Sequence, residues 1–161
     1  VSSGVRVSGG AKLTYSSSSK SVKVSKTGKI TIAGNFVGRA VITVKSSETS
    51  CYKAASKKFN VTVMPAVPSI TKAVNSPKST IAVSWKGSKT CSGYAVQYST
   101  NKSFKSGVKT IYITKNSTMK ATLTKLAKGK TYYIRAASYK KSGNTKILSS
   151  WSKVKSVKIR K

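Results

Sequence analysis

The stretch LTKLAKGKTYYIRA, residues 123–136, decides the fold class. Its second half alternates apolar and other side chains, so that Tyr132, Ile134 and Ala136 would face a core while the residues between them face outward. A period of two residues indicates a half-buried β-strand. Runs of roughly four to eight residues with this alternation recur between Ser, Gly, Asn and Lys clusters, and no segment has a helical period. The sequence therefore predicts an all-β protein.

The same alternation places the predicted strands. In the first half we expect strands at residues 20–25, 29–33, 40–45 and 57–63. The segment KTGK, residues 26–29, predicts a tight hairpin turn between the first two, with Val22, Val24, Ile30 and Ile32 on one face. In the second half, after an entry strand near Ile70, we expect strands at residues 80–85, 93–99, 108–114, 120–126, 131–139 and 153–160.

Two of the three prolines, Pro65 and Pro68, lie in the segment MPAVPS at residues 64–69. Proline cannot donate to a strand ladder, so we place a domain boundary there. The expected organisation is a first domain at 1–64, a linker at 65–68 and a second domain at 69–161. Seven strands in the second domain fit a Greek-key sandwich. The predicted fold class is all-β, with two tandem Greek-key β-sandwiches.

The charge is strongly one-sided. The 161 residues include 32 Lys and Arg but one acid, Glu48, and no His, giving a formal net charge of +31. General acid–base catalysis needs a group that titrates near neutrality, and paired-carboxylate hydrolysis needs two acids. Carboxylate cages for calcium or magnesium and His/Cys/Asp sites for zinc lack their ligands as well. We therefore expect a protein that is not an enzyme, with no catalytic residue, no cofactor and no metal.

Cys51 and Cys91 leave two readings open, one disulfide or two free thiols. Two cysteines in a chain of this length are no disulfide framework, which favours free thiols. The N-terminal residues lack the plan of a signal peptide, and no apolar run approaches a membrane span. We expect the chain to be a fragment of a longer protein.

Four motifs carry a resemblance in the second half: IAVSWKG with Trp85, SGYAVQYST with Tyr94 and Tyr98, LTKLAKGKTYYIRA, and the closing SSWSKVKSVKIRK. By these motifs residues 69–161 resemble a fibronectin type III domain of the kind found at the C-termini of secreted proteins of Gram-positive gut anaerobes. The resemblance implies structural roles for Trp85, in the core, and for Tyr132, as a tyrosine corner that bonds the backbone near Leu126. It implies structural roles also for Tyr94, Tyr98, Leu126 and Gly129.

The segment GAKLTYSSSSKSVKVSKTGKITIAGNFVGRAVITV, residues 10–44, combines a Ser-rich turn, a valine pair, a hairpin with a glycine, and a glycine before AVITV. By this pattern residues 1–64 resemble a bacterial Ig-like domain of group 2. Members of that family begin with a further strand, so the resemblance implies an N-terminally truncated domain.

The excess of charge indicates a polyanionic partner. Lysines are dispersed over both halves, and a lysine is a point charge without the planar fork of arginine. This favours loose attraction to teichoic acid, mucin glycans, anionic lipid or nucleic acid over bidentate recognition of one motif. Nucleic-acid binding would be driven by the backbone and sensitive to salt. The bland alternative is a lysine-rich surface that serves solubility.

An aromatic strip is the candidate ligand surface. On the strand at 131–139, Tyr133, Arg135 and Tyr139 would face outward, near Tyr112 and Trp151. The strip could stack sugars or bases. The alternative, which we favour, is a structural cation–π stack of Trp151 on Arg135. The full candidate surface is Tyr112, Tyr133, Arg135, Tyr139, Lys140, Lys141, Lys146, Trp151, Lys153 and Lys155.

The resulting hypothesis is a monomeric, extracellular attachment module, secreted or held at the cell surface, that binds anionic polymers or surfaces. Its first alternative is a passive spacer that presents an upstream enzyme or adhesin. Its second is a nucleic-acid or host immune-receptor binder that uses the same charge.

Overall fold

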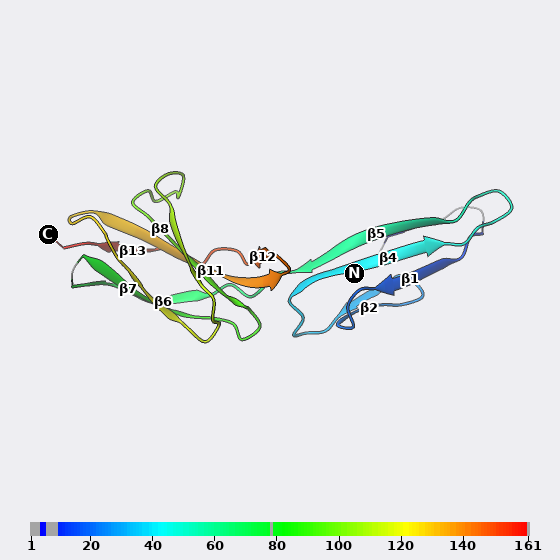
Figure 1. Cartoon of the computed structure of the whole chain (residues 1–161), viewed down its shortest axis with the longest axis horizontal. Coiled ribbons are helices and arrows are strands. Elements are labelled where there is room, and N and C mark those ends of the chain that lie inside the picture. The colour runs from blue at the N-terminus through cyan, green and yellow to red at the C-terminus, as the bar shows by residue number, and fades with distance from the viewer. Residues whose placement is uncertain (1–3, 6–9, 78, 161) are drawn as a thin grey trace. The chain divides into compact units, whose positions relative to one another are not determined.

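A computed structural model gives the structure of the chain, and it describes residues 4–5, 10–77 and 79–160. These residues form strands, turns and loops without a helix (Figure 1), so the all-β prediction is confirmed. The chain divides into two compact units, Val1–Val63 (unit 1) and Met64–Lys161 (unit 2). The division falls one residue before the end of the first predicted domain.

The described residues of unit 1 form two sheets. Its three-stranded sheet has the order β1-β4-β5, and its two-stranded sheet pairs β2 with β3. All pairings are antiparallel. The strand bounds are β1 Leu13–Ser17, β2 Val22–Val24, β3 Ile30–Ile32, β4 Gly38–Ser46 and β5 Ala55–Val63.

The β2–β3 hairpin has the predicted turn. Ser25 N donates to Lys29 O at 2.9 Å, and Gly28 has a φ of 77°. A positive φ suits glycine because it has no Cβ to collide with the backbone. Val22 pairs with Ile32, so the predicted common face of this hairpin is present.

The core of unit 1 is small. Among the described residues of this unit, four side chains are buried in the core, Val22, Ala40, Ile42 and Val44, three of them from β4. Partly buried apolar side chains surround them, from β1, β2, β3 and β5 among others. The even-numbered residues of β4 therefore supply most of the fully buried surface.

The strand β1, Leu13–Ser17, was not predicted, because the first strand that we expected begins at residue 20. Only Leu13 and Tyr15 in this strand are large apolar residues, which is too short a pattern to recognise. Its pairing with β4, from Leu13 opposite Ser46 to Ser17 opposite Ile42, is a long-range contact that local sequence does not encode.

Unit 2 is a sandwich-like arrangement of two sheets. One sheet has the order β10-β7-β6, and the other has the order β12-β11-β8-β9 with β13 also paired to β11. The strand bounds are β6 Ser69–Ser76, β7 Thr80–Lys86, β8 Gly93–Ser99, β9 Lys109–Ile113, β10 Lys120–Leu123, β11 Thr131–Ser142, β12 Thr145–Leu148 and β13 Lys155–Lys158.

The core of unit 2 lies between these sheets. Ile81, Val83 and Trp85 of β7 enter it from one sheet, and Val96 and Ile134 enter it from the other. Alternate residues of each strand are buried, as the period of two requires. This leaves the odd-numbered residues of β11 on the opposite, outer face.

The strand β12 was also missed. β11 continues past Tyr139 to Ser142 and turns back through Gly143, whose φ is 57°, so that Ser142 pairs with Thr145. The polar residues that follow Tyr139 hide the alternation, although Gly-Asn is a hairpin signal. No helix in the described part of the chain is long and apolar enough to cross a membrane.

Candidate functional site

The predicted ligand surface lies on the outer face of the larger sheet of unit 2. Across this face Arg135 of β11 stands opposite Gln97 of β8, and Ala137 stands opposite Ala95. Ala95 is in turn opposite Tyr112 of β9. Both alanines have no exposed area although they face away from the core. The longer side chains around them must therefore cover this part of the sheet.

The guanidinium of Arg135 lies against two aromatic rings. Its Cζ lies 4.6 Å from the ring centroid of Trp151 and 4.0 Å from that of Phe104. Its Nε and Nη2 donate to Gln97 Oε1 at 3.0 and 2.8 Å. Burial lowers the pKa of this guanidinium from its ordinary value. The cation–π stack of Arg135 on Trp151, which we favoured over ligand binding, is thus present. It occupies the guanidinium that a ligand would need.

Phe104 was not predicted at this position. It lies in the loop after β8 with a φ of 55°, and its N donates to Asn101 O at 3.0 Å. Asn101 Oδ1 also accepts from Ser103 N at 2.8 Å, which is an Asx turn. The strand period does not extend into a loop. The only signal in the sequence is the turn-forming asparagine three residues earlier.

Tyr139 lies on the outer side of β11, as predicted, but its inclusion in a ligand surface is wrong, because this side chain has no exposed area. It stands opposite Gly93, and its hydroxyl donates to Ile113 O at 3.3 Å. A Cβ on Gly93 would collide with Ile113 O and with the Tyr139 ring. The glycine therefore lets the ring lie across β8 and reach β9. Burial, followed by the nearby Cys91 and Tyr112, raises the Tyr139 pKa.

Tyr112 is the most exposed ring of the predicted strip, at 52%. It meets Tyr139 edge to face, with centroids 6.0 Å apart and planes at 78°. Lys146 Nζ lies 4.8 Å from the centroid of Tyr112 and 5.8 Å from that of Tyr139. A cation from the chain itself therefore lies over the Tyr112 ring, where a flat ligand would stack.

The other members of the candidate surface differ in exposure. Tyr133 is half-buried, between Ser99 of β8 and Ser156 of β13 in register. Lys140 is half-buried, and its Nζ donates to Thr90 O at 3.3 Å. The three remaining lysines are exposed: Lys141, Lys153 and Lys155. The outer face thus carries rings whose π-faces meet cations of the chain, together with the exposed Lys141. Lys155 is paired with the core residue Ile134, and Lys140 is an even-numbered residue of β11, so the register places these two lysines on the other side of the sheet.

The residues given structural roles are placed in or beside the core. Trp85 and Tyr94 meet edge to face, with centroids 5.4 Å apart. Tyr94 is fully buried, and desolvation raises its pKa to about 12. Tyr98 and Leu126 are buried as well. These side chains pack in the core and are not accessible to a ligand.

The backbone contact expected of Tyr132 is present, as its hydroxyl accepts from Ala127 N at 3.0 Å. Two residues further on, Gly129 has a φ of 73° and its N donates to Ile159 O at 3.0 Å. The segment between β10 and β11 is thereby fixed against the segment that follows β13.

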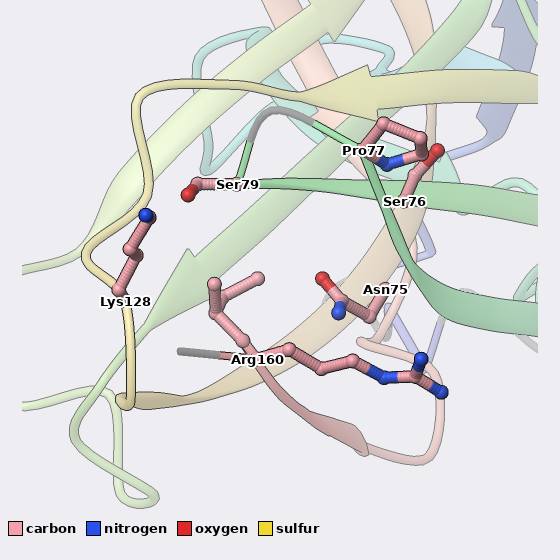
Figure 2. A pocket seen from close by; sticks show the side chains of 7 residues that line it. Asn75, Ser76, Pro77, Ser79, Lys128 and Arg160 are labelled. Carbon is pink, nitrogen blue, oxygen red and sulfur yellow. The ribbon is translucent and has the colours of Figure 1, made fainter.

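A second candidate site, which the sequence did not indicate, is a cavity of about 480 Å³ at this same end of unit 2 (Figure 2). Asn75 and Ser79, from the end of β6 and the turn after it, line it together with Lys128 and Arg160. Lysines are so frequent in this chain that Lys128 did not stand out. The only sequence signal is Asn75, a polar residue at an inward-facing position of β6.

The described parts of the chain hold no group of three His, Cys, Asp or Glu side chains that could bind a metal ion. Cys51, which is exposed, and Cys91, which is buried, are both free thiols, as the favoured reading expected. Cys91 Sγ donates to Ser88 O at 3.0 Å, inside the core of unit 2.

Comparison with known proteins identifies the family of unit 2. A search of curated sequences found no match. Among solved structures, the FN1–FN3 domains of chicken CNTN1 match with 15% identity and a TM-score of 0.51, covering 83% of this chain and 47% of that one. A structure titled as a myokine (17% identity, TM-score 0.48) and a computationally redesigned β-sandwich protein (25%, 0.46) each cover 60% of this chain, and 99% and 98% of their own.

The match to CNTN1 supports a β-sandwich fold and nothing finer. The family model named Fibronectin type III domain matches residues 66–155, more than half of the chain. Domains of this kind are generally non-catalytic and commonly extracellular. On this match, and on the two-sheet sandwich described above, the chain belongs to the fibronectin type III family.

Proposed function

We propose that this chain is a non-catalytic, extracellular attachment module that binds anionic polymers, such as teichoic acid or mucin glycans, through its lysines. One observation carries the proposal: every described lysine except Lys140 is exposed, while the sequence offers Glu48 as its single acidic side chain. The positive surface is therefore not neutralised from within. We include in the proposal that residues 1–64 are a bacterial Ig-like domain of group 2 in a surface protein.

The physical mechanism is the release of counterions. A polyanion holds a condensed layer of cations, and each lysine that replaces one of them contributes a favourable entropy of release. Lysine suits this task because its ammonium group is a mobile point charge that needs no fixed geometry. Arg135, the one arginine of the predicted surface, is already engaged by Gln97, Phe104 and Trp151. Affinity should then follow charge density more than sequence or shape.

A salt series tests the proposal. Binding of the full chain to teichoic acid, heparin, mucin, anionic vesicles and nucleic acid would be measured from about 50 to 300 mM salt. We expect saturable binding to an envelope or mucin polymer that persists at physiological salt, with log K falling linearly against log salt. Absence of saturable binding to every polymer would refute the proposal and favour a spacer. Preference for nucleic acid, or salt-resistant binding to a host receptor, would favour the second alternative.

A further inference from the structure

A groove lies along one edge of unit 2, between residues 67–70, which lead into β6, and residues 151–155, which lead into β13. We call it the edge groove, and all of its residues belong to unit 2. In the described part of this unit β6 pairs with β7 alone and β13 pairs with β11 alone. The groove therefore lies where the two sheets are not joined by strand pairing. Its volume of about 520 Å³ is within the usual range of binding sites, roughly 300–1,000 Å³.

Both walls of the edge groove are fixed by contacts within the unit. Ser152 N donates to Ala136 O at 2.8 Å, and Ser152 Oγ accepts from Ala136 N at 3.0 Å. The neighbouring Trp151 is stacked on Arg135. In the opposite wall Ile70 is buried and is paired with β7. Because these walls are fixed in advance, binding in the groove has little ordering cost for this chain.

The edge groove exposes apolar side chains from both walls. Val67 is 50% exposed and Val154 is 44% exposed, and the half-buried Trp151 also lines the groove. Neighbouring exposed apolar side chains are typical of interaction sites. A sugar or phosphate polymer has no apolar side chain to place against these valines. Charge-driven attachment to such a polymer therefore does not account for the groove.

Two positive charges accompany these apolar side chains. Lys153 and Lys155 line the edge groove, and both are exposed. Lys155 is paired in register with the core residue Ile134, so its side chain leaves β13 on the inner side of the sheet, toward β6. Unit 2 has no acidic side chain that could pair with these lysines. A second copy of this cationic chain would bring like charges together, whereas an acidic partner would complement them.

We propose that the edge groove binds an extended acidic segment of a partner protein. An apolar side chain of that segment packs between Val67 and Val154, and carboxylates beside it bind Lys153 and Lys155. Because the groove is concave, it fits a projecting peptide side chain. A bilayer would instead require apolar side chains that protrude from the protein. The inference goes beyond the proposed function, since it adds a protein partner and a shaped site to the binding of polymers.

Three labelled peptides of equal length, titrated with the full chain at about 300 mM salt and followed by fluorescence anisotropy, test the site. The first peptide alternates leucine and glutamate. The second has serine in place of each leucine, and the third has glutamine in place of each glutamate. We expect the first to bind saturably and at least about tenfold more tightly than either control. NMR of the complex should show shifts of the backbone N–H groups of Val67 and Val154 and of the Trp151 indole N–H.

A double variant tests the apolar part of the groove. Val67→Ser/Val154→Ser should lower the affinity for the leucine–glutamate peptide to that of the serine peptide, because the side chains that pack against leucine are removed. The matched control Val108→Ser replaces another exposed valine of unit 2, which does not line the groove, and should leave the affinity unchanged. All three valines are exposed, so we expect the thermal midpoints of both variants to match the parent.

A second double variant tests the charged part. Lys153→Gln/Lys155→Gln should abolish the preference for the leucine–glutamate peptide over the glutamine peptide. The matched control Lys128→Gln/Lys130→Gln removes two exposed lysines of unit 2 that do not line the groove. It lowers the net charge equally and should keep most of this preference. A control variant that loses as much affinity as the groove variant would show that only net charge attracts the peptide.

The remaining outcomes separate this inference from the proposed function. Equal binding of the three peptides would overturn the edge groove as a site, while saturable binding to teichoic acid or heparin would still support attachment. If Val67→Ser/Val154→Ser loses binding to phosphatidylglycerol vesicles and keeps its affinity for the peptide, the groove takes a lipid and the inference is wrong. Peptide selectivity without saturable polymer binding would support the groove and refute the attachment proposal.

Discussion

The two units have similarly cationic surfaces but hydrophobic cores of very different size. Unit 2 has nineteen lysines, two arginines and no acid, and unit 1 has nine lysines, two arginines and Glu48. Both surfaces are therefore strongly cationic. Among the described residues, however, unit 2 buries thirteen apolar side chains in one cluster and unit 1 buries four. Repulsion acts on both units, but it acts against a much smaller hydrophobic stabilisation in unit 1.

This difference indicates that repulsion between surface charges limits the stability of a unit only where few side chains are buried in its core. A cluster between two sheets, which includes the edge-to-face pair of Trp85 and Tyr94, can tolerate a net charge that a core of Val22, Ala40, Ile42 and Val44 tolerates less well. Stability in such proteins is a small difference between large terms. We therefore expect unit 1 to unfold first.

The largest effect should come from the core of unit 1. Ile42→Ala removes a fully buried side chain of β4 and should cost about 2–5 kcal/mol, enough to unfold unit 1 by itself. Both tryptophans, Trp85 and Trp151, belong to unit 2. Tryptophan fluorescence should then keep its native transition, while far-UV circular dichroism and NMR report the loss of unit 1.

The matched control is Ile134→Ala in unit 2, which deletes the same groups from an equally buried position. We expect a lower midpoint in the fluorescence transition but a folded unit 2 at 25 °C. Loss of unit 2 with survival of unit 1 would show that the ranking of the two cores is wrong.

Alkaline pH should destabilise unit 2, which holds the fully buried tyrosines. The Tyr94 pKa is about 12 in the folded state, against 10.0 unperturbed, because desolvation disfavours the phenolate. The stabilisation is therefore complete below pH 10 and is lost as pH rises towards 12. Two pKa units correspond to about 2–3 kcal/mol.

Denaturant unfolding of unit 2, followed by tryptophan fluorescence from about pH 9 to pH 11.5, measures this loss. Lysines discharge over the same range and relieve repulsion, so the decisive quantity is the difference between the parent and Tyr94→Phe. The variant also loses the hydrogen bond from the hydroxyl to Asn116 O, so slopes against pH are compared. Parallel slopes would mean that Tyr94 does not ionise differently in the two states.

The same contrast explains how much could be predicted from the sequence. In unit 2 strands with clear alternation were predicted closely, and Gly93–Ser99 was predicted to the residue. The strands β1 and β12 were missed because serine or lysine fills positions where pairing with β4 or β11 supplies the stability. Strands defined by their partners more than by their own apolar residues are beyond a local pattern.

The candidate ligand surface was also only partly predictable from local sequence patterns. The alternation correctly placed Tyr139 on the outer face of β11. The burial of its ring, however, depends on Gly93 and Ile113, which belong to two other strands. The stack of Arg135 on Trp151 was expected, whereas Phe104 came from a loop. The cavity at Asn75 joins three segments distant in sequence, and no spacing along the chain predicts it.

Added salt should reduce the difference in thermal stability between the two units. Raising NaCl from about 0.1 to 1 M shortens the Debye length from about 10 to 3 Å and so screens lysine repulsion. We expect both midpoints to rise, by about 4–8 °C for each 1 kcal/mol gained. The gain should matter most in unit 1, because its core is smaller. Calorimetry in NaCl, with sucrose as an uncharged control, measures it, and midpoints that fall or stay constant in NaCl would contradict internal repulsion.

The smallest effect concerns the surface charge itself. Lys23→Gln/Lys45→Gln in unit 1 and Lys153→Gln/Lys155→Gln in unit 2 each remove two exposed lysines. If attachment uses charge spread over both units, each pair should reduce the slope of log K against log salt for a polyanion by at most about 2, and by similar amounts. Surface changes of this kind should leave the unfolding free energy within about 0.5 kcal/mol, so any change in binding reports the interface. A slope that responds to Lys153 and Lys155 alone would instead locate attachment on the fibronectin type III unit, and the two units would then differ in function as well as in core size.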